Sequence, residues 1–89
     1  MAIKNKNLQF ATVDKIEDWF WYAWNNMYSH LMVLRYNNEY DFPIYVSYKD
    51  SAMEMYENYR FGENLEILEV LNVDISFASQ MKQYKPFNF

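Results

Sequence analysis

Two pairs of carboxylates lie close enough in the sequence to be considered for acid–base chemistry. Glu54 and Glu57 form one pair, and Glu39 and Asp41 form the other. General acid–base catalysis needs a carboxyl group beside the proton that it transfers, and paired catalytic carboxylates face each other across a cleft. Both pairs lie in polar stretches without any pattern that predicts a pocket. We therefore expect no catalytic residues and no enzymatic activity.

The other residue types that carry catalytic or cofactor chemistry are nearly absent from the chain. It has no cysteine, and His30 is its only histidine. A zinc site would have to be built mainly from carboxylates, so His30 is expected to cap a helix or lie on the surface. Phosphate-binding loops, dinucleotide fingerprints and nucleophile elbows need several glycines, whereas Gly62 is the only one here. We therefore predict no metal and no cofactor.

The composition is that of one folded domain over residues 1–89. The chain is 52% hydrophobic and 21% aromatic, which is unlike a disordered sequence. The first ten residues, MAIKNKNLQF, lack an apolar run of signal-peptide length, and no later stretch is long and apolar enough to span a bilayer. We expect a cytoplasmic protein, located in the host cytoplasm if it is viral.

The elements that position these side chains follow from periodicity and from turn and cap residues. Residues 65–70 are read as a strand, although a helix is the alternative because their apolar residues do not alternate throughout. The order matches the βαββαβ pattern of ferredoxin-like sandwiches, an α+β class with two helices on one face of an antiparallel sheet. The predicted elements are a strand at 8–10, a helix at 13–28, strands at 31–36 and 43–48, a helix at 52–60, one last strand made of residues 65–70 and the alternating residues 71–77, and an extended tail at 82–89.

All three tryptophans lie within the predicted first helix, between Trp19 and Trp24. At about 100° per residue, one arc of this helix forms the core stripe, with Trp19 at its margin. That arc holds Val13, Ile16, Phe20, Ala23, Trp24 and Met27. Trp21, Tyr22 and Tyr28 fall outside it and are expected to be exposed. They would be covered by the tail with Phe87 and Phe89, by a second copy of the chain, or by a partner.

Negative charge is concentrated in residues 54–74, which hold six acidic residues against Arg60 alone, in a chain whose net charge is −4. The recurring ones are Glu54, Glu57, Glu63, Glu66 and Glu69. One interpretation is that they are solvated positions on two adjoining elements. The other is an acidic patch that binds a basic surface on a partner, because such a patch can compete for a groove that attracts phosphate. The acidic bias disfavours direct binding to nucleic acid.

These observations predict a small acidic, non-enzymatic protein that binds and blocks a larger protein with a basic surface. Its size, acidity and Asn-, Tyr-, Lys- and Phe-rich composition favour a phage or mobile-element inhibitor of a nucleic-acid-handling host defence enzyme, of the anti-CRISPR or another anti-defence type. The alternatives are a self-assembling structural or virion-associated subunit, and a single-strand nucleic-acid binder that uses the hairpin tyrosines Tyr36, Tyr40, Tyr45 and Tyr48. The chain would be a monomer or a homodimer. The predicted partner-binding residues are Trp21, Tyr22, Tyr28, Glu54, Glu57, Glu63, Glu66 and Glu69.

Overall fold

A computed structural model of the chain describes residues 8–89. The first ten residues are expected to carry no export signal, and residues 1–7 of that segment lie outside the described residues. Its elements are α1 (Val13–Asn25), β1 (Tyr28–Tyr36), β2 (Tyr40–Ser47), α2 (Ala52–Tyr59), β3 (Leu65–Asn72) and α3 (Phe77–Met81). The three strands form one antiparallel sheet in the order β2-β1-β3, which confirms the predicted α+β class.

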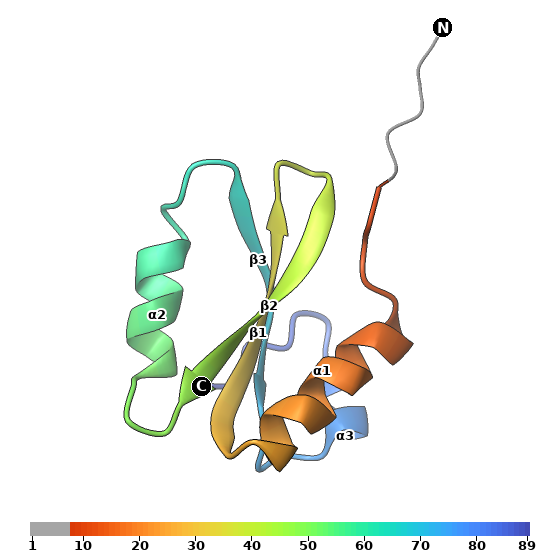
Figure 1. Cartoon of the computed structure of the whole chain (residues 1–89), viewed down its shortest axis with the longest axis vertical. Helices are drawn as coiled ribbons and strands as arrows, with labels where there is room; N and C mark the ends of the chain where they lie inside the picture. The colour runs from red at the N-terminus through yellow and green to blue at the C-terminus, as the bar shows by residue number, and fades with distance from the viewer. Residues whose placement is uncertain (1–7) are drawn as a thin grey trace, which may run out of the picture.

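The two longer helices cover opposite faces of the sheet (Figure 1). On the central strand β1, Leu31 and Val33 pack on the side of α1, whereas Met32 and Leu34 pack on the side of α2. The prediction that both helices lie on one face is therefore wrong. The physical reason is visible in the sequence, because a strand that is apolar at every position from 31 to 34 needs cover on both faces.

The ferredoxin-like order is not found within residues 8–89. Residues 8–10 do not form a strand, and Gln9 makes only an isolated parallel bridge to Tyr40 on the outer edge of β2. The chain leaves the sheet directly afterwards, because it must reach the start of α1. The predicted first strand is therefore reduced to a short edge contact.

The predicted strand at 71–77 ends at Asn72, and the chain then turns into α3. Ser76 caps this short helix by accepting a hydrogen bond from the backbone of its first turn. Val73 and Phe77 are nevertheless buried in the core on the side of α1. Burial at alternate positions therefore holds for Val73 and Phe77 but not for Ile75, which is 41% exposed, because a turn followed by a helix replaces the predicted strand. Residues 65–70 belong to β3, as favoured.

Helix α1 begins as predicted, with the Thr12 hydroxyl accepting a hydrogen bond from the backbone N–H of Lys15 at 3.2 Å. It ends at Asn25 rather than near residue 28. Met27 adopts a positive φ of 62°, which reverses the chain so that β1 can begin one residue later. This sharp reversal removes Met27 from the helix and from the core.

Gly62 follows α2, which is capped by Ser51, but it does not take the left-handed conformation that its position predicts. Asn64 does so instead, with φ 63°. Glycine is needed at position 62 for space, because a Cβ there would lie 2.5 Å from the Leu65 side chain and 3.1 Å from the Tyr59 carbonyl oxygen. The chain therefore approaches itself closely between α2 and β3.

The C-terminal residues cover the outer edge of β3. The backbone of residues 86–88 forms two hydrogen bonds of 2.8 Å with the N–H and the C=O of Val70. Beyond this contact, the rings of Phe87 and Phe89 pack against Tyr56 of α2, with centroid distances of 5.6 and 5.2 Å. The arm therefore lies on the side of α2, away from α1.

The outer edge of β2 is protected by a proline. The Asp41 N–H points outward, where it donates to the Gln9 carbonyl at 3.0 Å. Because alternate residues of a strand point their N–H groups in the same direction, Pro43 lies at the next outward position and offers no donor. The sequence predicted a strand that begins at Pro43, whereas Pro43 is the fourth residue of β2.

A fully buried glutamine joins α3, the end of β3 and the C-terminal arm. The Gln80 amide nitrogen donates to the carbonyls of Asn72 and Ile75 at 2.8 and 2.9 Å. Its oxygen accepts from the Asn72 N–H and the Asn88 side chain at 2.8 and 3.0 Å. A buried polar group whose hydrogen bonds are all made can fix the relative position of the elements around it.

Candidate protein-binding surface

Two tryptophans on the outer side of α1 are exposed and touch each other. Trp21 and Trp24 are 44% and 54% exposed, with ring centroids 5.9 Å apart in an edge-on arrangement. Trp21 also meets the buried Phe20 ring edge-on at 5.3 Å, which anchors the pair to the core. We call Trp21 and Trp24 the tryptophan surface. Val13 and Met27, at the two ends of the helix, are also exposed.

The exposure of Trp21 was expected, but that of Trp24 was not. Only Ile16, Phe20 and Ala23 of α1 are buried, and Trp19 packs against them from the margin. This stripe is narrower than the arc assigned to the core, because a helix on a three-stranded sheet contacts it along a narrow line. The prediction that three further residues belong to the core is therefore wrong. Val13 and Trp24 lie at one edge of that arc and Met27 lies beyond the end of α1, and all three are exposed.

A carboxylate is hydrogen-bonded to the tryptophan surface. The indole N–H of Trp21 donates to Glu17 Oε2 at 3.2 Å, one helical turn earlier. Asp14 and Asp18 are exposed on the same N-terminal half of α1. The surface is therefore aromatic at one end of the helix and acidic at the other.

Tyr22 lies on a different side of α1 from Trp21, whereas Tyr28 is the first residue of β1. Tyr28 is half-buried against the core on the side of α1, so the prediction that it is exposed on the helix is wrong, because the helix ends before it. Both rings contact Tyr45 of β2, with centroid distances of 4.9 and 5.3 Å. Burial and the neighbouring Tyr22 and Tyr28 raise the pKa of Tyr45. The structure therefore separates the predicted aromatic site into a tryptophan pair and a tyrosine cluster. Tyr45 was missed because nothing in the sequence pairs it with α1.

The C-terminal arm does not cover the tryptophan surface. Phe87 and Phe89 pack on Tyr56, which belongs to the helix on the other face of the sheet. One of the three explanations considered for the exposed aromatic residues is thereby removed. A second copy of the chain and a different partner are left as occupants.

The five predicted acidic residues do not gather in one patch. Glu54 and Glu57 are exposed on α2, and Glu57 forms an ion pair with Arg60 at 3.3 Å. Glu63 is exposed in the connection to β3. These three lie on or beside the α2 side of the molecule, so they cannot share a contact with the tryptophan surface.

The remaining two, Glu66 and Glu69, lie on the face of β3 that carries α1. They are aligned with Arg35 and Val33 of β1, and an irregular register between the two pairs brings both carboxylates to one face. The Glu69 Oε1 atom is buried and has no hydrogen-bond partner within the described residues. Burial raises the pKa of Glu69, and the nearby Asp41 carboxylate raises it further.

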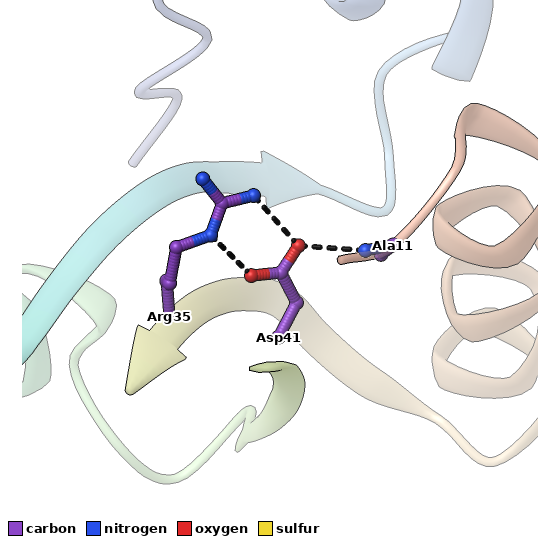
Figure 2. Close-up of polar contacts among 3 residues, drawn as sticks. All are labelled: Ala11, Arg35 and Asp41. Carbon is purple, nitrogen blue, oxygen red and sulfur yellow. Dashed lines mark hydrogen bonds and ion pairs between the residues drawn. The ribbon is translucent and has the colours of Figure 1, made fainter. Parts of the chain in front are cut away.

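Asp41 joins the N-terminal segment to the sheet (Figure 2). Its carboxylate accepts hydrogen bonds from Arg35 Nε and Nη2 at 2.6 and 3.0 Å, and from the Ala11 N–H at 2.7 Å. The Arg35 guanidinium lies 3.7 Å from the centre of the Phe10 ring, and its hydrogen bond to Asp41 raises the pKa of Arg35. The Asp41 side chain is 1% exposed, so it serves as a structural joint.

Beside this joint is an open hollow of about 430 Å³. The carboxylate oxygens of Asp41 are already used by Arg35 and Ala11. Asp41 is therefore not free to orient a small ligand in this hollow. Its lining consists of Gln9, Phe10, Thr12, Lys15, Trp19 and Asp41.

The hairpin tyrosines are divided between the two faces of the sheet. Tyr36 and Tyr40 are cross-strand partners in contact at 5.6 Å, and Tyr40 also contacts Phe42 on the side of α2. Tyr45 lies on the side of α1. A platform for single-stranded nucleic acid stacks successive bases on one surface. These tyrosines form no such continuous surface, and cross-strand packing accounts for the contacts of the first two.

Comparison of the chain with protein-family models, curated proteins and solved structures finds no match. Within residues 8–89, no three His, Cys, Asp or Glu side chains are placed to hold a metal ion together. None of the described helices has the length and apolar character needed to cross a membrane. The functional interpretation therefore depends on the exposed surface itself.

Proposed function

We propose that the chain is a non-enzymatic protein that binds a larger protein, with Trp21 and Trp24 as anchors. The observation that carries this proposal is the exposure of both indoles, 44% and 54%, in mutual contact on the outer side of α1. Tryptophan is enriched at the energetic hot spots of protein interfaces. Burying such apolar surface contributes about 25 cal/mol per Å², so leaving it in water forgoes stabilisation that a partner can supply.

Both outer edges of the sheet are poorly suited to pairing with a strand of a partner, which favours docking through side chains. The C-terminal arm occupies the edge of β3 at Val70, and Pro43 lacks a donor on the outer edge of β2. Binding by strand addition needs a row of free backbone groups along an edge. The exposed helix surface of α1 is therefore the better candidate for recognition.

Within this class, we favour an inhibitor that blocks a nucleic-acid-handling defence enzyme by occupying its surface. The support is compositional, namely small size, a net charge of −4 and a high aromatic content. Glu54, Glu57 and Glu63 are too far around the molecule to act together with the tryptophans. The acidic contribution near the anchors comes instead from the first half of α1.

Cells of the source organism provide the test. The wild-type chain and a Trp21→Ala/Trp24→Ala variant are expressed with the same affinity tag, and co-purified proteins are quantified by mass spectrometry. We expect at least one protein to be depleted about tenfold or more with the variant, which corresponds to about 1.4 kcal/mol. Tyr84→Ala is the matched control, because Tyr84 is an aromatic residue that is 92% exposed and belongs neither to α1 nor to the tryptophan surface. Identical protein sets for all three chains would contradict the proposed function.

A further inference from the structure

The charges of α1 are arranged asymmetrically along its axis. Asp14, Glu17 and Asp18 lie in its first half, whereas residues 19–26 carry no charge. At about 100° per residue, Glu17, Trp21 and Trp24 fall within an arc of about 60°. One stripe of the helix is therefore acidic toward its N-terminus and aromatic toward its C-terminus.

Among the described residues, no cation forms an ion pair with Asp14, Glu17 or Asp18 at the acidic end of this stripe. Within residues 8–89, ion pairs join Arg35 to Asp41 and Arg60 to Glu57, and neither involves an acid of α1. The one lysine of the helix, Lys15, lies near Trp19 on another side, with its nitrogen 5.9 Å from the ring centre. The hydrogen bond from Trp21 to Glu17 holds a carboxylate at the rim of the tryptophan surface.

Burying the tryptophans would bring these carboxylates to the rim of an interface. A carboxylate that loses water without gaining a cation or a donor costs free energy, whereas a facing Lys or Arg offsets that cost and also steers the encounter. The spacing is set by the helix rise of about 1.5 Å per residue. Glu17 therefore lies about 10 Å, and Asp14 about 15 Å, from Trp24 along the axis.

On this basis, and relying on the proposed function, we infer which kind of site the surface binds. It is an apolar recess on a different protein, with a Lys or Arg side chain about 10–15 Å from the recess along the direction of α1. The recess takes Trp21 and Trp24, and the basic residue meets Glu17 or Asp14. The asymmetry of the stripe fixes the direction in which α1 lies on its partner.

A second copy of the chain is a poor occupant of the same surface. A symmetric pair places the same patch of both copies in contact. If the two α1 helices ran parallel, Glu17 would face its own equivalent, and if antiparallel, each acidic half would face tryptophans. Neither arrangement sets a cation of this stripe opposite Asp14 or Glu17, because the stripe contains none, and self-association through it would therefore bury uncompensated carboxylates.

Site-specific crosslinking in cells of the source organism tests the inference. Asn25→p-benzoylphenylalanine places a photoreactive group on the exposed last residue of α1, beside the tryptophan surface. We expect an adduct with another protein, mapped by mass spectrometry to an apolar site with Lys or Arg nearby. The absence of any adduct, or an adduct only with a second copy, would overturn both the inference and the proposed function.

Affinity measurements with the purified protein from that adduct separate the two claims. Glu17→Lys should weaken binding about tenfold or more, and wild-type affinity should fall as salt rises from low to high concentration. Glu63→Lys makes the same charge change in an exposed loop and should alter the affinity less than about twofold. If Trp24→Ala weakens binding while Glu17→Lys does not, the inference is overturned and the proposed function stands.

Discussion

Phe87 packs against Tyr56 of α2, with ring centroids 5.6 Å apart. This contact fixes the C-terminal arm on the face of the sheet opposite to α1 (Figure 1). The apolar residues of the arm therefore complete the core beside α2, and they leave Trp21 and Trp24 in water. The location of one phenylalanine thus decides between an internal and an external explanation of the tryptophan surface.

Phe87→Ala should lower the free energy of unfolding in urea by about 1–3 kcal/mol, since the half-buried ring loses contacts with the α2 side of the core. The tryptophan emission maximum of the folded protein, and its quenching by acrylamide, should not change. Tyr84→Ala is the control for removing an aromatic ring from the same segment. A red shift or stronger quenching in folded Phe87→Ala would place the arm on the tryptophans instead.

Asp41→Ala should destabilise the fold by about 2–4 kcal/mol, because it leaves the Arg35 guanidinium and the Ala11 N–H without their shared acceptor. Chemical denaturation measures the loss. Glu57→Ala breaks the exposed ion pair with Arg60 and should cost less than about 1 kcal/mol. Equal costs for the two variants would show that Asp41 does not act as a joint.

The raised pKa of Glu69 predicts a specific dependence of stability on pH. Burial and Asp41 raise its pKa above the ordinary value of 4.5, so the folded chain keeps the proton to a higher pH than the unfolded chain does. The contribution of Glu69 to stability is therefore complete below pH 4.5 and is lost as the pH rises through the folded pKa.

Glu69→Gln should remove this dependence. Relative to wild type, its free energy of unfolding should rise between pH 4.5 and neutral pH, by less than about 1 kcal/mol because water partly screens the group. Urea denaturation at several pH values provides the measurement, with Glu63→Gln as the baseline for the same change in an exposed loop. A relative stability of Glu69→Gln that falls as the pH rises would contradict the assigned direction.

The sequence predicted local elements better than their arrangement. The start of α1, the hairpin of β1 and β2, and α2 all follow from caps, periodicity and turn residues close in the chain. The side on which each helix packs depends on contacts between distant residues, and only the apolar run of residues 31–34 signalled cover on both faces. At Val73 and Phe77, alternation reported burial without specifying a strand.

The candidate site was predicted in part. The exposure of Trp21 and Tyr22 follows from a helical wheel and is confirmed. Trp24 was misplaced because the wheel does not give the width of the buried stripe, which depends on the narrow sheet beneath it. The acidic residues were treated as one set because their spacing along the chain does not reveal that α2 and β3 present them to different sides.

Trp24→Ala, measured for both partner affinity and thermal stability, tests the central claim most directly. The partner is the protein identified by crosslinking beside the tryptophan surface. Phe20→Ala is the reference for a core substitution, since Phe20 is 1% exposed. We predict that Trp24→Ala weakens binding by about tenfold or more at a stability cost below about 1 kcal/mol, whereas Phe20→Ala costs about 3–5 kcal/mol. Unchanged affinity for Trp24→Ala, or a loss of stability as large as that of Phe20→Ala, would contradict the account.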